Sequence, residues 1–178
     1  DFPRLREYWQ HAGEVLTSRA AELMLSGQVV RSSDTPARKE VLRRLREFRT
    51  NRDAEIRLYP CGMAAIAAVW RALRQHDPIN PSVQFGFPYV DTLKIQQRFA
   101  PADVRFYPVG QPEDLRQLTE LLSRQKIAAV LCESTTNPLL TSLDLQALRQ
   151  LADQHGFLLV IDDTLAACIN HDVLPYAD

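Results

Sequence analysis

Hydrophobic and polar positions divide the chain into two parts that follow different patterns. Up to about residue 55, apolar residues recur at helical spacing, which predicts a helix over 5–27 and a strongly basic helix over 37–49. The basic residues fit a solvated helix face, with anion binding as the alternative. Beyond residue 55, short apolar runs alternate with amphipathic segments. We therefore expect an N-terminal helical segment, 1–55, followed by an α/β domain that occupies 56–178.

The elements expected in the second part alternate in type. Pro112 opens one of the helices, as proline does at a first helical position, and Gly156 fits the end of another. Repeated βα units with apolar strands predict a mostly parallel sheet flanked by helices. The expected strands are 56–59, 82–85, 104–107, 127–132 and 157–161, and the expected helices are 62–75, 89–99, 112–124 and 144–155.

Composition and charge narrow the classes of partner. Hydrophobic residues make up 46% of the 178 positions and charged residues 24%, which is ordinary for a globular protein with a real core. A net charge of −1 gives no general attraction to nucleic acid or to anionic membranes. The apolar runs are far shorter than the roughly 20 residues of a membrane span. We therefore expect neither a nucleic-acid partner nor a membrane partner.

Cysteine and histidine usage points away from disulfides and metals. Cys61, Cys132 and Cys168 are odd in number and form no C-x-x-C pair, so reduced thiols in a cytoplasmic protein are the simplest interpretation. The histidines show no metal-ligand spacing, and no metal site is predicted.

Polar side chains follow two apolar runs where strands of a parallel sheet would end. Glu133 begins a polar segment after 127–132, and Asp162 and Asp163 follow 157–161. Ligands sit beyond the carboxyl ends of parallel strands. A carboxylate there suits a ligand with a basic ring nitrogen, because it keeps the nitrogen protonated and the ring an electron sink. Asp163 is less suited, because side chains alternate along a strand. Helix capping is the alternative for Asp162, and a surface acid or an arginine partner for Glu133.

Three further positions have possible binding roles beside structural ones. Gly62 lies at a strand-to-helix junction, where free backbone N–H groups can bind an anion, although a glycine there is also structural. Tyr89 can present a ring face to a flat heterocycle or serve as a packing residue. The amide of Asn137 can donate a hydrogen bond to a phenolate-type oxygen, or Asn137 and Pro138 can simply close a loop.

Taken together, these segments resemble the Cys/Met-metabolism family of pyridoxal phosphate (PLP) enzymes, which includes cystathionine γ-synthase, cystathionine lyases, methionine γ-lyase and homoserine sulfhydrylases. Residues 133–140 are similar to the family's E-S-P-S-N-P-L-L, 160–164 to V-V-D-N-T, 61–63 to S-G-M and 2–4 to Y-x-R. The sequences of residues 86–94 and 172–178 most resemble the cystathionine γ-synthase-like branch known from fungi. The resemblance covers nearly the whole chain, in the family's motif order.

The resemblance implies a fold and a set of roles. The fold would be the large domain of fold type I PLP-dependent transferases, incomplete at the C-terminus. Backbone N–H groups of Gly62 and Met63 would bind the PLP phosphate, Tyr89 would stack on the ring, Asn137 would contact the ring oxygen, and Asp162 would pair with the pyridine nitrogen. Arg4 would reach the phosphate of a neighbouring subunit, which implies a homodimer or homotetramer.

The chain departs from the family pattern at several positions. Phe2 stands where the family has a phosphate-binding tyrosine, and Cys61 replaces a serine. The family's Schiff-base lysine lies in a Ser-x-Thr-Lys motif shortly after the segment that matches 174–178. None of the lysines of this chain has that context; they are Lys39, Lys94 and Lys126. We therefore expect no catalytic residue within these 178 positions and no activity of the chain alone, which also lacks the family's small C-terminal domain.

The expected activity is that of a transsulfuration enzyme acting on small amino acids. An activated homoserine ester would be condensed with cysteine by γ-replacement, as in cystathionine γ-synthase. The alternatives are another lyase or sulfhydrylase of the family, and a non-catalytic fragment or partner subunit. A related fold type I aminotransferase is a further alternative. The sequence of residues 137–140 favours the Cys/Met-metabolism family over it.

Overall fold

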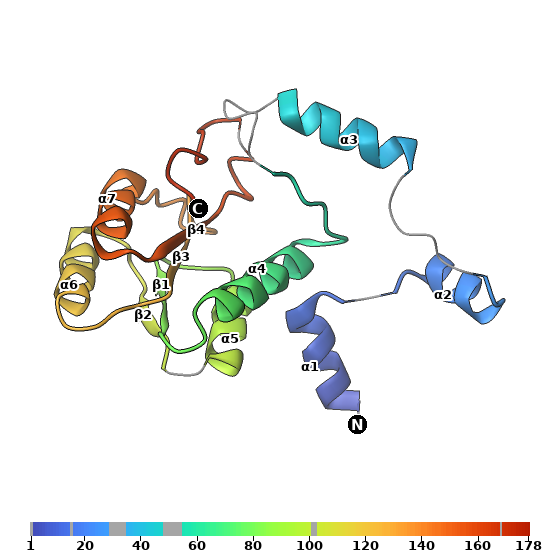
Figure 1. Ribbon diagram of the computed structural model, residues 1–178, viewed down its shortest axis with the longest axis horizontal. Coiled ribbons are helices and arrows are strands. Elements are labelled where there is room, and N and C mark those ends of the chain that lie inside the picture. Colours follow the sequence, from blue (N-terminus) through green and yellow to red (C-terminus); the bar gives the residue numbers. More distant parts are fainter. Residues whose placement is uncertain (1, 15, 29–34, 48–54, 101–102, 168) are drawn as a thin grey trace. The chain divides into compact units, whose positions relative to one another are not determined.

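The computed structural model describes residues 2–14, 16–28, 35–47, 55–100, 103–167 and 169–178 (Figure 1). The chain forms two compact units, Asp1–Ala65 and Ile66–Asp178. The first unit holds three helices and the start of a fourth, and the second holds a parallel sheet with its covering helices. The boundary expected after residue 55 stays a prediction.

The single helix expected over 5–27 is wrong, because two helices occupy this range. Helix α1 (Phe2–Ala12) ends where Gly13 adopts a φ of +61°, and α2 (Ser18–Leu25) begins after Thr17. The Thr17 side chain caps α2 by accepting a hydrogen bond from the Ala20 N–H. A side chain at Gly13 would lie 2.3 Å from the Ala64 nitrogen, so this close approach requires glycine.

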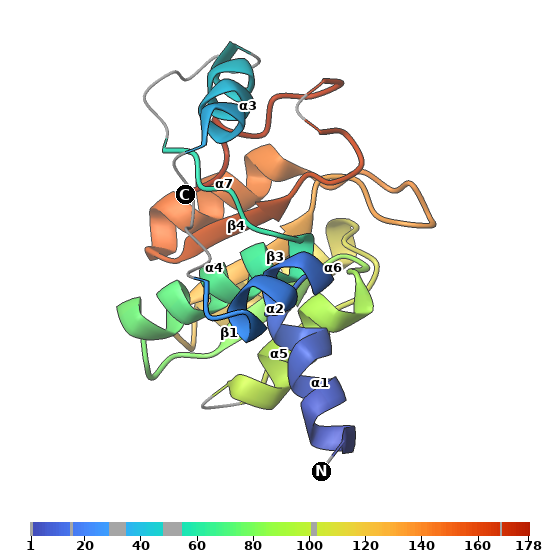
Figure 2. The same cartoon turned by 90° about the vertical axis from the view of Figure 1, so that its right-hand side faces the viewer.

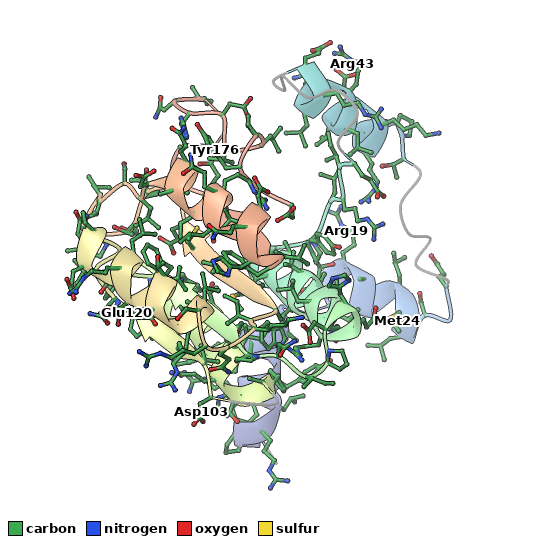
Figure 3. All side chains as sticks on the ribbon, turned by 60° about the vertical axis from the view of Figure 1, so that its left-hand side comes forward. Arg19, Met24, Arg43, Asp103, Glu120 and Tyr176 are labelled. Atoms are coloured by element: carbon green, nitrogen blue, oxygen red, sulfur yellow. The ribbon has the colours of Figure 1, made fainter. Side chains whose placement is uncertain are left out.

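The basic helix is confirmed as α3 (Pro36–Glu47), and its charges pair along its own surface. Glu40 accepts hydrogen bonds from Arg43 and Arg44 at 2.8 Å each, and Arg43 also contacts Glu47. Figure 3 labels Arg43 on this helix. These bonds, that of Arg43 first, lower the pKa of the exposed Glu40 carboxyl to about 2. Pairs of this spacing are typical of a solvated face. Most of the turn expected at 32–36 lies outside the described residues.

The second unit is built from alternating helices and strands, as predicted from residue 62 onward. Its elements are α4 (Gly62–His76), which enters the unit at Ile66, then β1 (Ser82–Phe85), α5 (Val90–Phe99), β2 (Arg105–Tyr107), α6 (Pro112–Leu122), β3 (Ala129–Glu133), α7 (Leu145–His155) and β4 (Leu158–Asp162). All pairs are parallel, in the order β2-β1-β3-β4. The expected fold class, a mostly parallel sheet flanked by helices, is therefore confirmed.

The strand expected at 56–59 does not form. These residues are described, and they carry no strand. Arg57 and Tyr59 are exposed. An isolated strand is not stable by itself, because its backbone groups need a neighbouring strand. The apolar alternation at Ile56 and Leu58 is too short to predict reliably that a strand forms.

The two faces of the sheet are covered by different helices. Figure 1 shows α6 and α7 on one side and α4 and α5 on the other. Alternate strand residues follow this division, since Val130 and Leu159 pack with α6 and α7 whereas Leu131 and Val160 pack with α4 and α5. Figure 2 shows α7 running beside β4. Burial on both faces explains why the strands read as continuous apolar runs.

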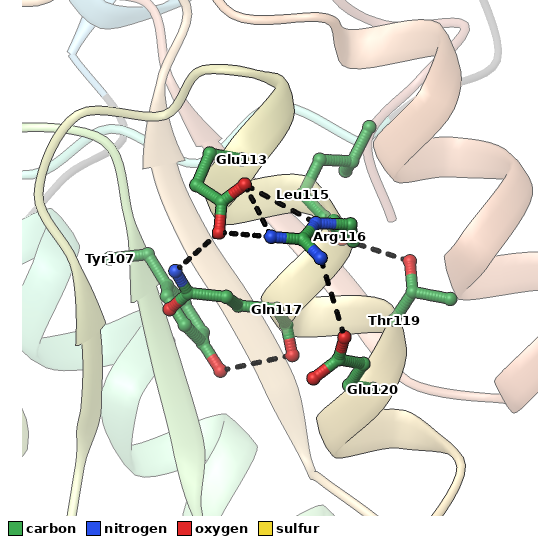
Figure 4. A network of polar contacts seen from close by, with 7 residues as sticks. All are labelled: Tyr107, Glu113, Leu115, Arg116, Gln117, Thr119 and Glu120. Carbon is green, nitrogen blue, oxygen red and sulfur yellow. Dashed lines mark hydrogen bonds and ion pairs between the residues drawn. The ribbon is translucent and has the colours of Figure 1, made fainter.

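Helix α6 is fixed at its start by Asp114. This buried carboxylate accepts hydrogen bonds from the Val109 and Gly110 N–H groups, at 2.9 and 2.7 Å. The outer face of the helix carries an exposed network in which Glu113 pairs with Arg116 (Figure 4). Exposed ion pairs of this kind contribute little to stability. Asp114 therefore matters more for the position of α6 than the visible surface network does.

The carboxyl ends of β1 and β2 meet at two glycines. The Gly86 N–H donates to the Tyr107 carbonyl at 2.8 Å, and both Gly86 and Gly110 have positive φ, at +76° and +70°. A side chain at Gly110 would lie 2.3 Å from Leu143 Cδ2 and 3.1 Å from the Gly86 Cα. Only glycine therefore fits at position 110, where the backbone approaches Gly86 and the buried Leu143 closely.

The outer edge of β4 contacts the last residue of the chain. The Asp178 N–H donates to the Leu159 carbonyl at 3.0 Å, and the Asp178 carboxylate accepts from the Leu159 N–H at 2.8 Å. Arg149 on α7 binds the same carboxylate at 2.8 Å.

No helix within the described ranges combines the length and the apolar character that a membrane span requires.

The cysteines provide a first prediction. Cys132 lies in the core on β3, where burial raises the pKa of its thiol to about 12, whereas Cys61 is exposed. At pH 8 the Cys132 thiol is therefore protonated as well as covered. We expect iodoacetamide to alkylate Cys61 roughly a hundredfold faster than Cys132 in the native protein. Peptide-resolved mass spectrometry measures both rates, and equal rates before denaturation would contradict the fold.

Candidate cofactor-binding site

Three strands bring polar residues to one edge of the sheet. Because β1, β3 and β4 are parallel, the loop after Phe85, the side chain of Glu133 and that of Asp162 all lie at their carboxyl ends. Glu133 and Asp162 are register partners on neighbouring strands. By alternation, both belong to the sheet face covered by α4 and α5. This edge is where parallel α/β sheets bind ligands.

Asp162 presents a half-buried carboxylate at the end of β4. Its Oδ1 accepts hydrogen bonds from the Thr164 N–H, at 3.0 Å, and from the Thr164 hydroxyl. Among the residues that the structure describes, both bonds to this side chain end on Oδ1, and Oδ2 receives none. The segment that follows is a turn rather than a helix, so the alternative of helix capping does not apply. Oδ2 can therefore accept a hydrogen bond from a protonated nitrogen.

Asp163 is directed to a different task. Its Oδ1 accepts a hydrogen bond from the Ser134 hydroxyl at 2.6 Å, which ties the end of β4 to the end of β3. The Ser134 N–H donates to the Asp162 carbonyl at 3.0 Å and extends the same connection. Asp163 is thus engaged within the protein.

Tyr89 is held at both its backbone and its side chain. It is the N-cap residue of α5, and its N–H donates to Glu133 Oε1 at 2.5 Å. Its hydroxyl interacts with the carboxylate of Asp91, a buried residue in the first turn of α5. The negative charge of Asp91, and then burial, raises the pKa of the Tyr89 phenol above its ordinary value. The side chain remains half exposed, so a face of the fixed ring can contact a ligand.

The alternatives to a ligand role for Glu133 were a surface acid and the partner of an arginine, and neither applies among the described residues. The side chain is half buried, it accepts a hydrogen bond from the Tyr89 N–H, and the Asn137 N–H also acts on its charge. Burial, and also the negative charge of Asp162, raises the pKa of Glu133, against the lowering effect of the two N–H groups. Glu133 therefore connects residues from three loops at this edge.

Asn137 lies in a tight loop after β3. The Thr136 N–H donates to the Thr141 carbonyl, and Thr135 and Ser142 form an isolated antiparallel bridge. The peptide bond between Asn137 and Pro138 is cis, and the Asn137 side chain is exposed. The loop thus both closes on itself and leaves the Asn137 amide accessible to a ligand.

The candidate phosphate ligands belong to the first unit. Gly62 is the first residue of α4, and a side chain there would meet nothing within 4 Å. Met63 is half buried, and Gly13 packs against its backbone. Arg4 is exposed on α1. Within the described ranges, no group of three or more histidine, cysteine, aspartate or glutamate side chains is arranged to hold a metal ion.

Comparisons with known proteins identify the family and support the fold. The family model of Cys/Met metabolism PLP-dependent enzymes matches residues 19–177. Cystathionine γ-synthase of Neurospora crassa is 42% identical over 82% of this chain, and that of Saccharomyces cerevisiae 36% identical over 74%. The chain spans 24% of the length of each of these relatives. The solved structure of metB from Corynebacterium glutamicum superposes with a TM-score of 0.50 at 24% identity, covering 67% of this chain and 30% of that one, and supports the fold.

This chain belongs to the family of Cys/Met metabolism PLP-dependent enzymes. Its architecture is part of the fold type I large domain, as the resemblance implied. PLP is the cofactor of the family, and the donor set at the sheet edge fits it. Among the described residues, Oδ2 of the Asp162 carboxylate accepts no hydrogen bond, so it suits a ring nitrogen. The half-exposed ring of Tyr89 suits a flat heterocycle.

Proposed function

We propose that these residues form the cofactor-ring side of a cystathionine γ-synthase-like enzyme. The activity proposed for the whole protein is γ-replacement on an activated homoserine ester by the thiol of cysteine. The observation that carries the proposal is the position of Asp162, a strand-end carboxylate whose Oδ2 remains available, in a chain 42% identical to a cystathionine γ-synthase. The identity favours this reaction over the other lyases and sulfhydrylases of the family.

Each candidate residue has one task in this proposal. When bound, PLP supplies the electron sink that the chemistry at the amino-acid carbons requires. Asp162 keeps a proton on the ring nitrogen, Tyr89 covers one ring face, and the Asn137 amide donates to the ring oxygen. Backbone N–H groups of Gly62 and Met63 hold the phosphate at the positive end of α4.

Assembly completes the proposed site. Arg4 on α1 would contact the phosphate bound by a neighbouring subunit, so we propose a cytoplasmic homodimer or homotetramer. None of Lys39, Lys94 and Lys126 would be the lysine that moves protons in this family, because none lies in the family's Ser-x-Thr-Lys motif. The 178 residues alone are then inactive. Light scattering of the native gene product distinguishes this assembly from a monomer.

The reaction is tested with the native gene product. We expect the purified protein to show the visible absorption of bound PLP. With an activated homoserine ester and cysteine it should form cystathionine, detected by mass spectrometry, at a rate that falls sharply when cysteine is omitted. A 2-oxo acid and ammonia as sole products, whether or not cysteine is present, would contradict γ-replacement and indicate an elimination enzyme. A protein without the absorption band would contradict the whole proposal.

A further inference from the structure

Glu133 stabilises the start of helix α5 from a distant part of the chain. Tyr89, the N-cap residue, makes no side-chain capping hydrogen bond. Its N–H donates instead to Glu133 Oε1, which lies 44 residues away in sequence, at 2.5 Å. A carboxylate at a helix N-terminus is further stabilised by the helix dipole. The backbone position of Tyr89 therefore depends on β3 as well as on its own loop.

The other contacts of Glu133 lead to the remaining ring-binding candidates. The Asn137 N–H, in the first part of the loop after β3, also acts on this carboxylate and lowers its pKa. Glu133 is the register partner of Asp162 on β4. Tyr89, Asn137 and Asp162 thus surround one side chain, although they come from three different loops or strand ends.

We propose that Glu133 is a positioning residue that sets the orientation of the cofactor ring by fixing Tyr89 and Asn137 relative to Asp162. This inference rests on the proposed function, because it assigns the ring to these three residues. Glu133 itself acts through backbone N–H groups and does not touch the ring. A shift at Glu133 would therefore move the stacking surface and the oxygen contact together, while Asp162 remains in place on β4.

The test compares three substitutions in the native gene product. E133A removes the acceptor, E133Q keeps a carbonyl oxygen for the Tyr89 N–H but loses the charge, and E113Q is the matched control. Glu113 is an exposed acid on α6, which covers the opposite face of the sheet, and it pairs with Arg116 (Figure 4). The probe is PLP itself. The readouts are its dissociation constant, the visible circular dichroism per bound PLP, and the thermal midpoint of the PLP-free protein.

We expect E133A to raise the PLP dissociation constant by about tenfold or more, since two N–H groups lose their acceptor. The circular dichroism per bound PLP should fall or change sign, because the ring is reoriented. E133Q should recover most of both signals, and E113Q should match the unsubstituted protein. If E133A does not fold, E133D replaces it. Its carboxylate is one methylene shorter and cannot reach the Tyr89 N–H, so the same changes are expected.

Two outcomes would overturn the inference, and they are distinguishable. An E133A protein with a lower thermal midpoint but an unchanged dissociation constant and unchanged dichroism would show a merely structural role, while the proposed function stands. If the unsubstituted protein shows no PLP binding, the proposed function fails, and the inference fails with it.

Discussion

Replacing Gly110 with alanine should destabilise the second unit by about 3 kcal/mol or more, enough to prevent folding of a marginally stable domain. The added methyl group would lie 2.3 Å from Leu143 Cδ2, at a residue whose φ is +70°. Leu143 is buried in the main core, so it cannot move aside freely. Urea unfolding followed by far-ultraviolet circular dichroism measures the loss.

Gly156 provides the matched control. It has a similar φ, +74°, at the C-terminal end of α7, but a side chain there would meet nothing within 4 Å. G156A should therefore cost only the backbone strain of about 1 kcal/mol. In a double-mutant cycle, L143A should offset part of the G110A loss, because it removes the clashing atoms. Equal costs for the two glycine substitutions would contradict the close approach of Gly110 to Gly86 and Leu143.

The second large effect is expected at Asp162. D162N should weaken PLP binding to the native gene product by about a hundredfold, because an amide cannot hold a proton on the ring nitrogen as a carboxylate does. The visible absorption of the bound cofactor should shift as well, since its ring is no longer protonated. Titration with PLP under matched conditions measures both quantities.

Asp163 is the neighbouring control for this substitution. D163N reproduces the D-N-T sequence of the family and alters the residue that accepts the hydrogen bond from Ser134. We expect a modest loss of stability and an unchanged PLP dissociation constant. If D163N weakened binding as strongly as D162N, the assignment of the ring nitrogen to Asp162 would be wrong.

Much of the second unit could be predicted because its local signals agree with its packing. The apolar run ending at Cys132 became β3, and the amphipathic segment after Asp144 became α7, with the Asp144 side chain accepting from the Ala147 N–H. Gly156 ends that helix in the left-handed conformation. Strong period, cap and glycine signals therefore sufficed where each element is buried by its neighbours in sequence.

The first unit was predicted less well, because its breaks depend on contacts that the local sequence does not show. Gly13 interrupts the expected helix where its backbone lies against Met63 and Ala64, far along the chain. The alternating residues at 56–59 had no neighbouring strand to pair with. Helical period alone does not reveal either fact.

The site was predicted in part for the same reason. A carboxylate after a buried strand is visible in the sequence, and Asp162 was found in this way. The link between Glu133 and Tyr89 depends on which strands are adjacent and in what register, and it joins residues 44 positions apart. The sequence offered one signal for Glu133. Like Asp162, it is an acid at the end of a predicted strand, and the alternation of side chains places both on the same face of the sheet.

A crystal structure of the native gene product grown with PLP would show whether Asp162 holds the ring nitrogen. We expect electron density for the ring at the carboxyl ends of β1, β3 and β4, with the ring nitrogen within hydrogen-bonding distance of Asp162 Oδ2 and the ring stacked on Tyr89. A ring bound elsewhere, or one whose nitrogen faces away from Asp162, would contradict it.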